Sequence, residues 1–423
     1  MRPNRVIRFL FLLYSIYIII RLVFICTIKQ CFIIYDNRFH LERFNLSDWL
    51  INYSDGFVRR GLWGEIILYL YNTFNIDIAQ SVIWTTIIST TALILFTIYF
   101  FKKKGLSFFL LPNVILLGSF AMNNILCHRR DALMLLLIFL ALYFYKKWIE
   151  DRGRRLIYYI LLSLTGIFVI LTHEASFFCF VPFIVFDYYV RNKNKFLQKV
   201  TSTILFILPM LFTMGCACIF KGNEDVANNI WNSYAPYFQE EFGEMLPMGE
   251  GVNALAWDTE DTIKFHLSTN FLAPMPLLNG VPTIFAWCII FFFAFYLMVN
   301  VNKVKLFNYE RTEIENVHLA TILLIQFVSL LPMFTVLSCD LGRIFTYWSL
   351  TSFVIFGLFQ SKRYPLFSYC GNKLFTLYHQ MRIQSKWFYI IISLIICVPF
   401  IGFADPLSTS ILGGAINILR NLF

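Results

Sequence analysis

Charge is scarce in this 423-residue sequence, and the motifs of common soluble enzymes are missing. Only 14% of the residues are charged, whereas 58% are hydrophobic, and the mean hydropathy is +0.66. This composition excludes an ordinary soluble globular domain. The sequence has no G-x-x-x-x-G-K-[ST] phosphate loop, no H-E-x-x-H motif, no dinucleotide-binding glycine pattern, no G-x-S-x-G elbow and no C-x-x-C pair. Nucleotide-dependent chemistry and the familiar hydrolase mechanisms therefore have no support in the sequence.

Long apolar runs are abundant instead. About 17 to 25 apolar residues cross a bilayer, because a helix rises ~1.5 Å per residue through a hydrocarbon core of ~30 Å. The sequence predicts an all-α integral membrane protein, a single polytopic domain over 1–423 with about eleven transmembrane helices. The predicted spans are 6–28, 78–101, 106–126, 132–147, 156–172, 175–190, 200–220, 281–300, 316–338, 344–360 and 387–404. A signal peptide is the alternative at 6–28, but the run is long and no small-residue cleavage site follows it.

Basic residues gather in alternate connecting segments. These segments are 1–8, 102–104, 146–155, 191–199, 301–315 and 361–386. They hold 23 of the 35 Lys and Arg but six of the 25 acidic residues, counting Asp187. Because Lys and Arg excess marks cytoplasmic loops, we predict a multi-pass membrane protein with its N-terminus on the cytoplasmic side and its C-terminus outside. The basic tracts set this topology and predict no nucleic-acid partner.

The opposite, outer face carries two long segments, which would be periplasmic in a bacterium. In the first periplasmic loop, 29–77, the stretches 41–52 and 62–72 mix apolar and polar residues at helical spacing and predict interfacial helices joined by a DGFVRRG turn. The long periplasmic loop, 221–280, interleaves acidic residues with Trp231, Tyr234, Tyr237, Phe238 and Trp257. Acids beside aromatic rings suit a sugar ligand. An ordinary solvated loop with a few aromatic anchors is the alternative.

Short polar motifs lie at the predicted periplasmic ends of the spans. They are DGFVRRGL at 55–62, HRRDAL at 128–133, THE at 172–174 and DLGR at 340–343. Paired arginines can bind anionic oxygens, although they can also anchor a helix by snorkelling to lipid phosphates. Glu174 and Asp187 are separated by twelve uncharged residues, ~18 Å of helix, which predicts that the THE motif is recessed. A charge at that depth needs a partner or a wet cavity.

These motifs supply the candidate site. The predicted catalytic residues are Glu174, His173 and Asp55; the predicted phosphate or pyrophosphate ligands are Arg59, Arg60, Arg129, Arg130 and Arg343; the supporting residues are Asp131, Asp340 and His128. A local ion pair at a helix start is the alternative for Arg343 and Asp340. A lipid-linked sugar fits this set, because its phosphate would meet arginine while a carboxylate or imidazole removes the proton of an acceptor hydroxyl. No cofactor is predicted.

In layout and in these four motifs, the chain resembles bacterial multi-span enzymes of surface-polysaccharide assembly. The resemblance is to O-antigen or capsule repeat-unit polymerases (Wzy-like) and to GT-C glycosyltransferases. It implies polymerisation of polyprenyl-diphosphate-linked repeat units on the outer, periplasmic face of the bacterial cytoplasmic (inner) membrane. Its partners would be the polyprenyl-linked glycan, the lipid bilayer and other polysaccharide-assembly proteins.

Alternative functions remain open. A GT-C-type enzyme would use a polyprenyl-phosphate-linked sugar, and the resemblance would then make Asp55 or Asp48 a base or a ligand for a divalent metal. A lipid-linked glycan flippase would need ionisable residues near the midplane and often internal repeats, and no repeat is detected here. A membrane O-acyltransferase could use His173 as its base.

Overall fold

The chain is seen here in a computed structural model that describes residues 44–106, 129–273, 282–300, 313–338 and 341–359, with four isolated positions near the N-terminus. These residues form helices and no β-strand. Eight of the predicted spans fall in these ranges, and each corresponds to helical structure. The predicted spans 106–126 and 387–404 and most of 6–28 lie outside the described residues, so the total of eleven stays a prediction. An all-helical membrane architecture is confirmed.

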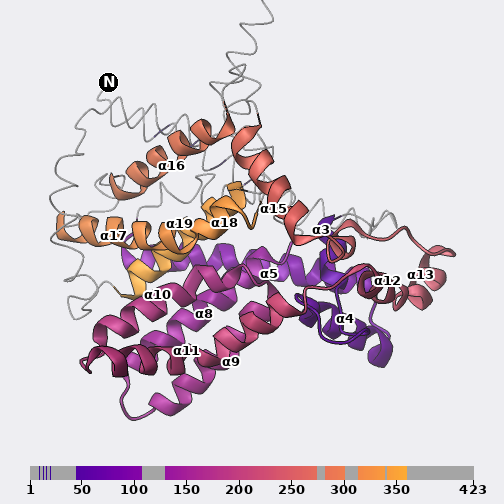
Figure 1. The fold of residues 1–423 in the computed structure, drawn as a ribbon, viewed down its shortest axis with the longest axis horizontal. Helices are drawn as coiled ribbons and strands as arrows, with labels where there is room; N and C mark the ends of the chain where they lie inside the picture. Colours follow the sequence, from indigo (N-terminus) through magenta and orange to yellow (C-terminus); the bar gives the residue numbers. More distant parts are fainter. Residues whose placement is uncertain are drawn as a thin grey trace, which may run out of the picture.

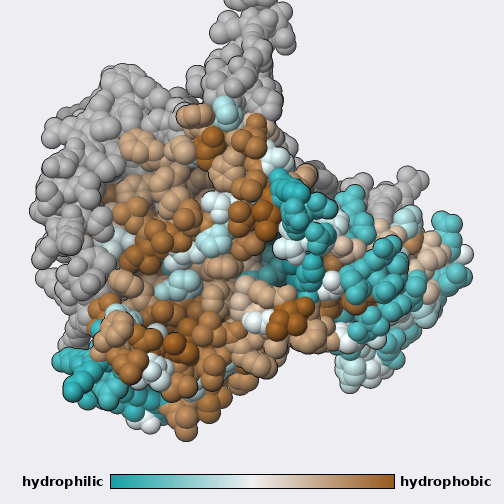
Figure 2. All heavy atoms as spheres, viewed as in Figure 1, coloured by the Kyte–Doolittle hydropathy of each residue, from teal (hydrophilic) through white to brown (hydrophobic). Residues whose placement is uncertain are grey.

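The apolar helices pack into one bundle (Figure 1). They are α5 (Ile78–Lys104), α8 (Asp131–Glu150), α9 (Arg155–Thr172), α10 (Ser176–Arg191), α11 (Phe196–Ile219), α16 (Thr283–Asn300), α17 (Glu313–Ser329), α18 (Leu331–Thr335) and α19 (Leu341–Leu358). Five of these, α5, α8, α9, α11 and α19, are long and apolar enough to cross a membrane. Figure 2 shows a hydrophobic surface over the bundle with hydrophilic residues toward two ends, as a bilayer-embedded protein requires.

Local chemistry sets the ends of these helices. The Asp77 carboxylate caps α5 by accepting a hydrogen bond from the Gln80 N–H at 2.6 Å, and Gly105 ends the helix in a left-handed conformation. Three lysines, Lys102 to Lys104, occupy the last turn, where positive charge favours the helix dipole. The predicted span 316–338 is divided, because Pro332 lacks a backbone N–H and starts the separate helix α18.

Helix α19 is the most enclosed of the five long apolar helices. Of its 18 residues, 89% are buried, whereas the buried share of an 18-residue apolar stretch in the other four helices is 33% to 44%. It packs against α5, α8, α10, α17 and α18. Trp348 anchors it by donating a hydrogen bond to the Leu323 carbonyl of α17 at 2.7 Å. The start of α19 is therefore held at a fixed place among the ends of the neighbouring helices.

The two long polar segments form a lobe at one end of the bundle (Figure 1). The first supplies α3 (Phe44–Ser47), the short 3-10 helix η2 (Asp48–Leu50) and α4 (Gly61–Phe74). The second supplies α12 (Glu224–Asn232), α13 (Ala235–Phe242) and α14 (Glu250–Asn253), followed by α15 (Thr259–Leu267) and the π-helical turn η4 (Ser268–Leu272). The predicted helix at 62–72 is thus present, and the described part of the stretch 41–52 contains two short helical pieces over 44–50.

The lobe has its own apolar core. Trp49, Leu50 and Ile51 are fully buried against Trp231 and Phe238 of the second segment. Hydrogen bonds also join the segments, from Asn52 Nδ2 to Ser233 Oγ and from the Gly251 N–H to Ser47 Oγ, each at 2.8 Å. The sequence leaves open whether the aromatic residues of this segment stack on a sugar or serve as anchors. Trp231, Tyr234, Tyr237 and Phe238 are buried in the core of the lobe, which favours the anchor interpretation for these four, whereas Trp257 is 46% exposed.

Gly64 of α4 allows the closest approach within the lobe. A Cβ atom at this position would lie 2.1 Å from the Ile51 carbonyl oxygen, a backbone atom that cannot rotate away. We therefore expect Gly64→Ala to lower the free energy of unfolding by at least about 1–3 kcal/mol, the usual range for overpacking. Thermal unfolding followed by tryptophan fluorescence measures the effect. Gly215→Ala in α11 is the matched control, because a Cβ there has no atom within 4 Å; equal melting temperatures for the two variants would contradict this packing.

Candidate functional site

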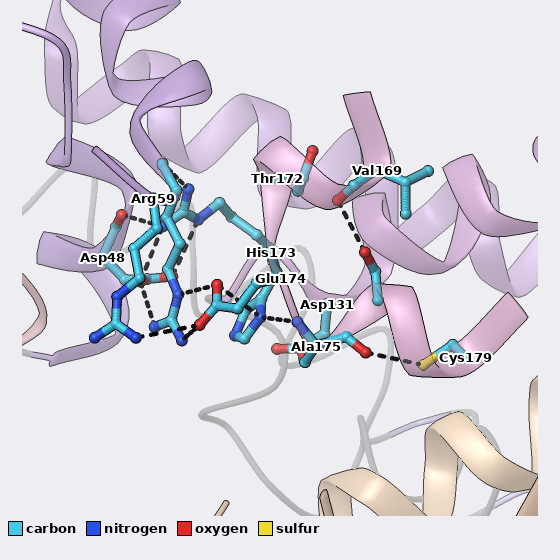
Figure 3. Close-up of polar contacts among 12 residues, drawn as sticks. Asp48, Arg59, Asp131, Val169, Thr172, His173, Glu174, Ala175 and Cys179 are labelled. Atoms are coloured by element: carbon cyan, nitrogen blue, oxygen red, sulfur yellow. Dashed lines mark hydrogen bonds and ion pairs between the residues drawn. The ribbon is translucent and has the colours of Figure 1, made fainter. Parts of the chain in front are cut away.

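Polar segments far apart in the sequence meet where the lobe joins the bundle. They are the end of the turn before α4, the η2 helix, the N-terminus of α8, the connection between α9 and α10, and the first turn of α19. Together they contribute Asp48, Arg59, Arg60, Arg130, Asp131, His173, Glu174 and Arg343. We call these residues the arginine–carboxylate cluster; Figure 3 shows Asp48, Arg59, Asp131, His173 and Glu174 gathered in one place.

Arg130 and Asp48 form the most buried pair of the cluster. Their side chains are 1% and 7% exposed, and Arg130 Nε lies 3.0 Å from Asp48 Oδ2. The same guanidinium donates to the Asp48 carbonyl and, at 2.7 Å, to the Arg60 carbonyl, and it lies 5.9 Å from the centre of the Trp49 ring. Burial alone would raise the pKa of Asp48, but Arg130 and then Arg60 outweigh it and hold the pKa well below its usual range. Asp48 is therefore ionised.

Arg60 connects this pair to Glu174. Its Nε donates to Glu174 Oε2 at 2.8 Å, its Nη2 donates to Glu174 Oε1, and its Nη1 lies 3.7 Å from Asp48 Oδ1. The backbone of Arg60 has φ +66°, a left-handed conformation that is uncommon for a side chain other than glycine, asparagine or aspartate. The fork to Glu174 and the carbonyl contact with Arg130 hold Arg60 in this strained form, a pattern concentrated at functional sites.

Arg59 is the more accessible arginine of the turn. Its side chain is 27% exposed, its Nη1 lies 3.7 Å from Glu174 Oε1, and its buried Nε has no hydrogen-bond partner. Its backbone N–H donates to the Phe220 carbonyl at 3.0 Å, which fixes the turn against the end of α11. Burial lowers the pKa of Arg59, but arginine remains charged at neutral pH. Arg59 is thus a cation whose backbone is fixed in position and whose Nε–H has no hydrogen-bond acceptor.

Asp131 and Arg343 bring in two further helix starts. Arg343 Nε in the first turn of α19 lies 3.3 Å from Asp131 Oδ1 at the N-terminus of α8, and both residues are buried. Asp131 also contributes to raising the pKa of Arg60. Asp131 therefore links Arg343 electrostatically to Arg60. Arg343 is thus paired with Asp131 of another helix, whereas Asp340, its partner in the local helix-start interpretation, lies outside the described residues.

Glu174 and His173 end α9 and lead into α10. The His173 N–H donates to the Val169 carbonyl at 3.1 Å, and the Ala175 N–H donates to His173 Nδ1 at 3.2 Å. Burial would raise the pKa of Glu174, but Arg60, His173 and Arg59 lower it well below its usual range. Burial, followed by the charge of Arg60, lowers the pKa of His173 to about 3. At neutral pH the site thus holds a carboxylate beside a neutral imidazole.

The contacts of His173 restrict its chemistry. Because Nδ1 accepts the Ala175 N–H, the neutral ring carries its proton on Nε2. A ring in this tautomer, with a pKa of about 3, is a poor general base and a competent hydrogen-bond donor. Glu174, whose side chain is 18% exposed, is the more accessible of the two groups, but its lowered pKa makes it a weak base as long as Arg60 and Arg59 remain paired with it.

The depressed pKa of His173 gives a pH dependence of stability. Between about pH 6.5 and pH 3 the unfolded chain binds a proton on this ring that the folded chain does not. The contribution of the neutral His173 ring to the free energy of unfolding is therefore complete above pH 6.5 and falls as the pH is lowered. We expect the wild type to lose about 2 kcal/mol relative to His173→Asn between about pH 6.5 and pH 5. Melting temperatures of both proteins across this range measure the difference, and parallel pH profiles would contradict the buried neutral ring.

The remaining predicted residues lie outside the cluster or outside the described chain. Asp55 is exposed at the tip of the turn, where its carboxylate accepts a hydrogen bond from Asn229 Nδ2 of α12 at 3.1 Å. Arg129 precedes the buried Arg130 and is partly exposed. His128 and Asp340 lie outside the described residues. Asp48, which only the GT-C resemblance had suggested beside Asp55, is the acidic residue of this segment that enters the cluster.

The cluster does not fit a divalent metal at Asp48. The Asp48 carboxylate faces the guanidinium groups of Arg130 and Arg60, so a cation there would meet two positive charges. Across the described parts of the chain, no three His, Cys, Asp or Glu side chains gather closely enough to hold a metal ion. The groups that the structure presents at this site suit an anion instead.

Comparison with known proteins identifies a family. A family model described as "Uncharacterised membrane protein Rv1490" matches residues 15–240, more than half of the 423-residue chain. The chain belongs to this family. The Rv1490 match includes every residue of the cluster except Arg343. No curated protein and no solved structure matches the chain. Membership of the Rv1490 family agrees with the membrane architecture and assigns no activity.

Proposed function

We propose that this protein is a membrane glycosyltransferase that joins polyprenyl-diphosphate-linked oligosaccharide repeat units on the outer face of the bacterial cytoplasmic membrane. The observation that carries the proposal is the arginine–carboxylate cluster at the ends of apolar helices. Its four arginines face three carboxylates, and His173 is neutral, so the cluster has a net charge of one positive. A phosphate group would balance that charge while its polyprenyl tail stayed in the bilayer.

The resting contacts suggest how a phosphate would activate the site. A phosphate oxygen that approached the accessible Arg59 would compete with Glu174 for Arg59 and Arg60. Glu174 would then lose the positive charges that lower its pKa, and that pKa would rise. The freed carboxylate would become a stronger base at the moment when substrate is bound.

The transfer step follows from these roles. The acceptor hydroxyl oxygen bonds to the anomeric carbon of the donor, and its proton passes to Glu174. The bond between that carbon and the phosphate oxygen breaks, and polyprenyl diphosphate leaves with the bonding electrons. The arginines stabilise the charge on the departing phosphate, as preorganised cations do in other transfers. His173 Nε2–H donates a hydrogen bond near the reacting groups and takes up no proton.

A second candidate is a GT-C-type transferase that adds a single sugar from a polyprenyl-phosphate carrier. The observation that favours it is Asp48, an acidic residue of the first predicted periplasmic loop, which contacts both Arg60 and Arg130 in the cluster. In a GT-C-type transferase the arginines would again bind the phosphate of the lipid carrier. The difference lies in the acceptor, which would be a growing glycan instead of a second repeat unit.

Deletion of the gene, followed by gel analysis of the surface glycan, separates these functions. Loss of the long ladder with one repeat unit retained is the result expected for a polymerase. A full ladder with altered sugar composition would instead support the single-sugar transferase. Lipid-linked units trapped on the cytoplasmic side would indicate a flippase and overturn both transferase proposals.

The proposed orientation can be measured independently. Cysteine introduced at Asp258, in the lobe, is expected to react with a membrane-impermeant maleimide in intact cells. Cysteine at Arg152, in the turn between α8 and α9, is expected to react only after the cells are opened. Both positions are exposed in the structure. The wild-type protein measures the background labelling of the native cysteines. The reverse labelling pattern would show that the topology is opposite to the one proposed.

A further inference from the structure

An apolar groove runs along α10 on the side that faces α11 and α17. Helix α10 packs against both neighbours and forms the floor. The groove has a volume of about 660 Å³, within the range of pockets that hold small-molecule ligands. Its lining is almost entirely hydrocarbon and aromatic, with Phe177, Val181, Val185 and Tyr189 from α10, Leu211 from α11 and Val328 from α17.

The groove begins beside the arginine–carboxylate cluster. Phe177, its first lining residue along α10, donates its N–H to the Glu174 carbonyl at 3.1 Å. The lining continues to Tyr189, twelve residues further, which is ~18 Å of helix. That length exceeds half of a hydrocarbon core of ~30 Å. A hydrocarbon chain lying in the groove would therefore have one end about one helical turn from Glu174 and would run along the apolar length of α10.

We infer that this groove binds the hydrocarbon tail of a polyprenyl-phosphate lipid whose phosphate is held by Arg59 and Arg60. The inference rests on the proposed function and names the part of the protein that selects the carrier. An apolar surface in a bilayer is ordinarily covered by bulk lipid. This groove differs because it is hollowed and because Phe177, at one end of it, lies one helical turn from Glu174 of the positively charged cluster, so a single long-chain lipid phosphate could reach both.

Photo-crosslinking tests the inference on the purified full-length protein. The probe is a polyprenyl phosphate with a diazirine in the middle of its tail, presented in vesicles of phosphatidylglycerol and phosphatidylethanolamine. Crosslinks are expected to map to α10, α11 and α17 at the groove and to be displaced by unlabelled polyprenyl phosphate. Equal displacement by added phosphatidylglycerol would show only bulk lipid at this surface and would overturn the inference.

Tryptophan substitutions inside and outside the groove test where the polyprenyl tail binds. Leu211→Trp fills the groove, whereas Leu208→Trp changes the same residue type one turn away on a lipid-exposed part of α11 that does not line it. Val328→Trp is a second filling variant, and its native side chain is already 67% exposed, so the larger ring has room. Crosslinking is expected to fall about tenfold, or ~1.4 kcal/mol, in both filling variants and to stay near wild type in Leu208→Trp. Equal crosslinking in all three would refute the assignment.

The two proposals fail in distinguishable ways. The crosslink reports binding and needs no turnover, so it is expected to persist in Glu174→Gln even if glycan assembly stops. A displaceable crosslink at the groove together with a normal surface glycan in the gene deletion would keep the lipid site and refute the transferase. Loss of the glycan ladder in the deletion without a groove crosslink would keep the transferase and refute the lipid site.

Discussion

Surface-glycan assembly is expected to fall by at least about a hundredfold when Glu174 is replaced by glutamine. The change keeps the size of the side chain and removes the group that accepts the proton, and general-base catalysis contributes ~10²–10⁴-fold to rate. The change also removes the negative charge that pairs with Arg60, whose Nε lies 2.8 Å from Glu174 Oε2. Complementation of the deletion strain, read as intensity of the long glycan ladder, measures the loss.

The control for Glu174→Gln is the same change at Glu260 of α15. The Glu260 side chain is 73% exposed and pairs only with Lys264 one turn away. An exposed pair of this kind contributes little to stability, so Glu260→Gln is expected to restore a normal ladder. Immunoblotting and melting temperature establish that the Glu174 variant is present and folded. A normal ladder in a strain that carries folded Glu174→Gln would remove Glu174 from the mechanism.

Arg130→Met is expected to lower the free energy of unfolding by about 3–5 kcal/mol, because removal of one partner leaves a buried charge uncompensated. The stranded group is Asp48, which is 5% exposed and enclosed by the lobe. The variant also loses the donors to the carbonyls of Asp48 and Arg60. Thermal unfolding of the detergent-solubilised protein measures the change. The turn before α4, which contains Arg60, is also expected to become sensitive to protease.

A double substitution separates charge compensation from general packing. Asp48→Asn combined with Arg130→Met removes both buried charges, so it is expected to be more stable than Arg130→Met alone. Arg152→Met is the matched control, since Arg152 is exposed in the turn between α8 and α9. Additive losses in the double variant would mean that Arg130 acts through packing and not through Asp48.

Much of the architecture was predictable because a membrane imposes simple rules on sequence. Uncharged runs long enough to cross a bilayer give helices such as α5 and α9 close to their predicted ends. Alternation of basic segments then predicts that the turn before α4, the start of α8, the end of α9 and the start of α19 share one face. Their meeting in one cluster follows, since a bundle brings ends on one side together.

The lobe and the choice between acidic residues were not predictable in the same way. Asp48 and Asp55 lie in one polar segment, and no local pattern indicates which of them meets Arg130, which is 82 residues from Asp48. Likewise, Trp231 and Phe238 have the composition of a sugar-binding loop, but their burial depends on partners such as Trp49 in a distant segment. Hydropathy predicts where an apolar helix lies in lipid, but it does not predict which residues of two polar segments pack against each other.

The enclosure of α19 has a consequence for biogenesis. Its mean hydropathy of 1.2 is the lowest among the five long apolar helices, and its sequence includes Arg343 and several hydroxyl residues. Arginine and other polar groups oppose release of a helix from the translocon into lipid. Because α19 is surrounded by helices that emerge earlier from the ribosome, its stable integration is expected to depend on their prior assembly, with the acidic side chain of Asp131 already in place to receive Arg343.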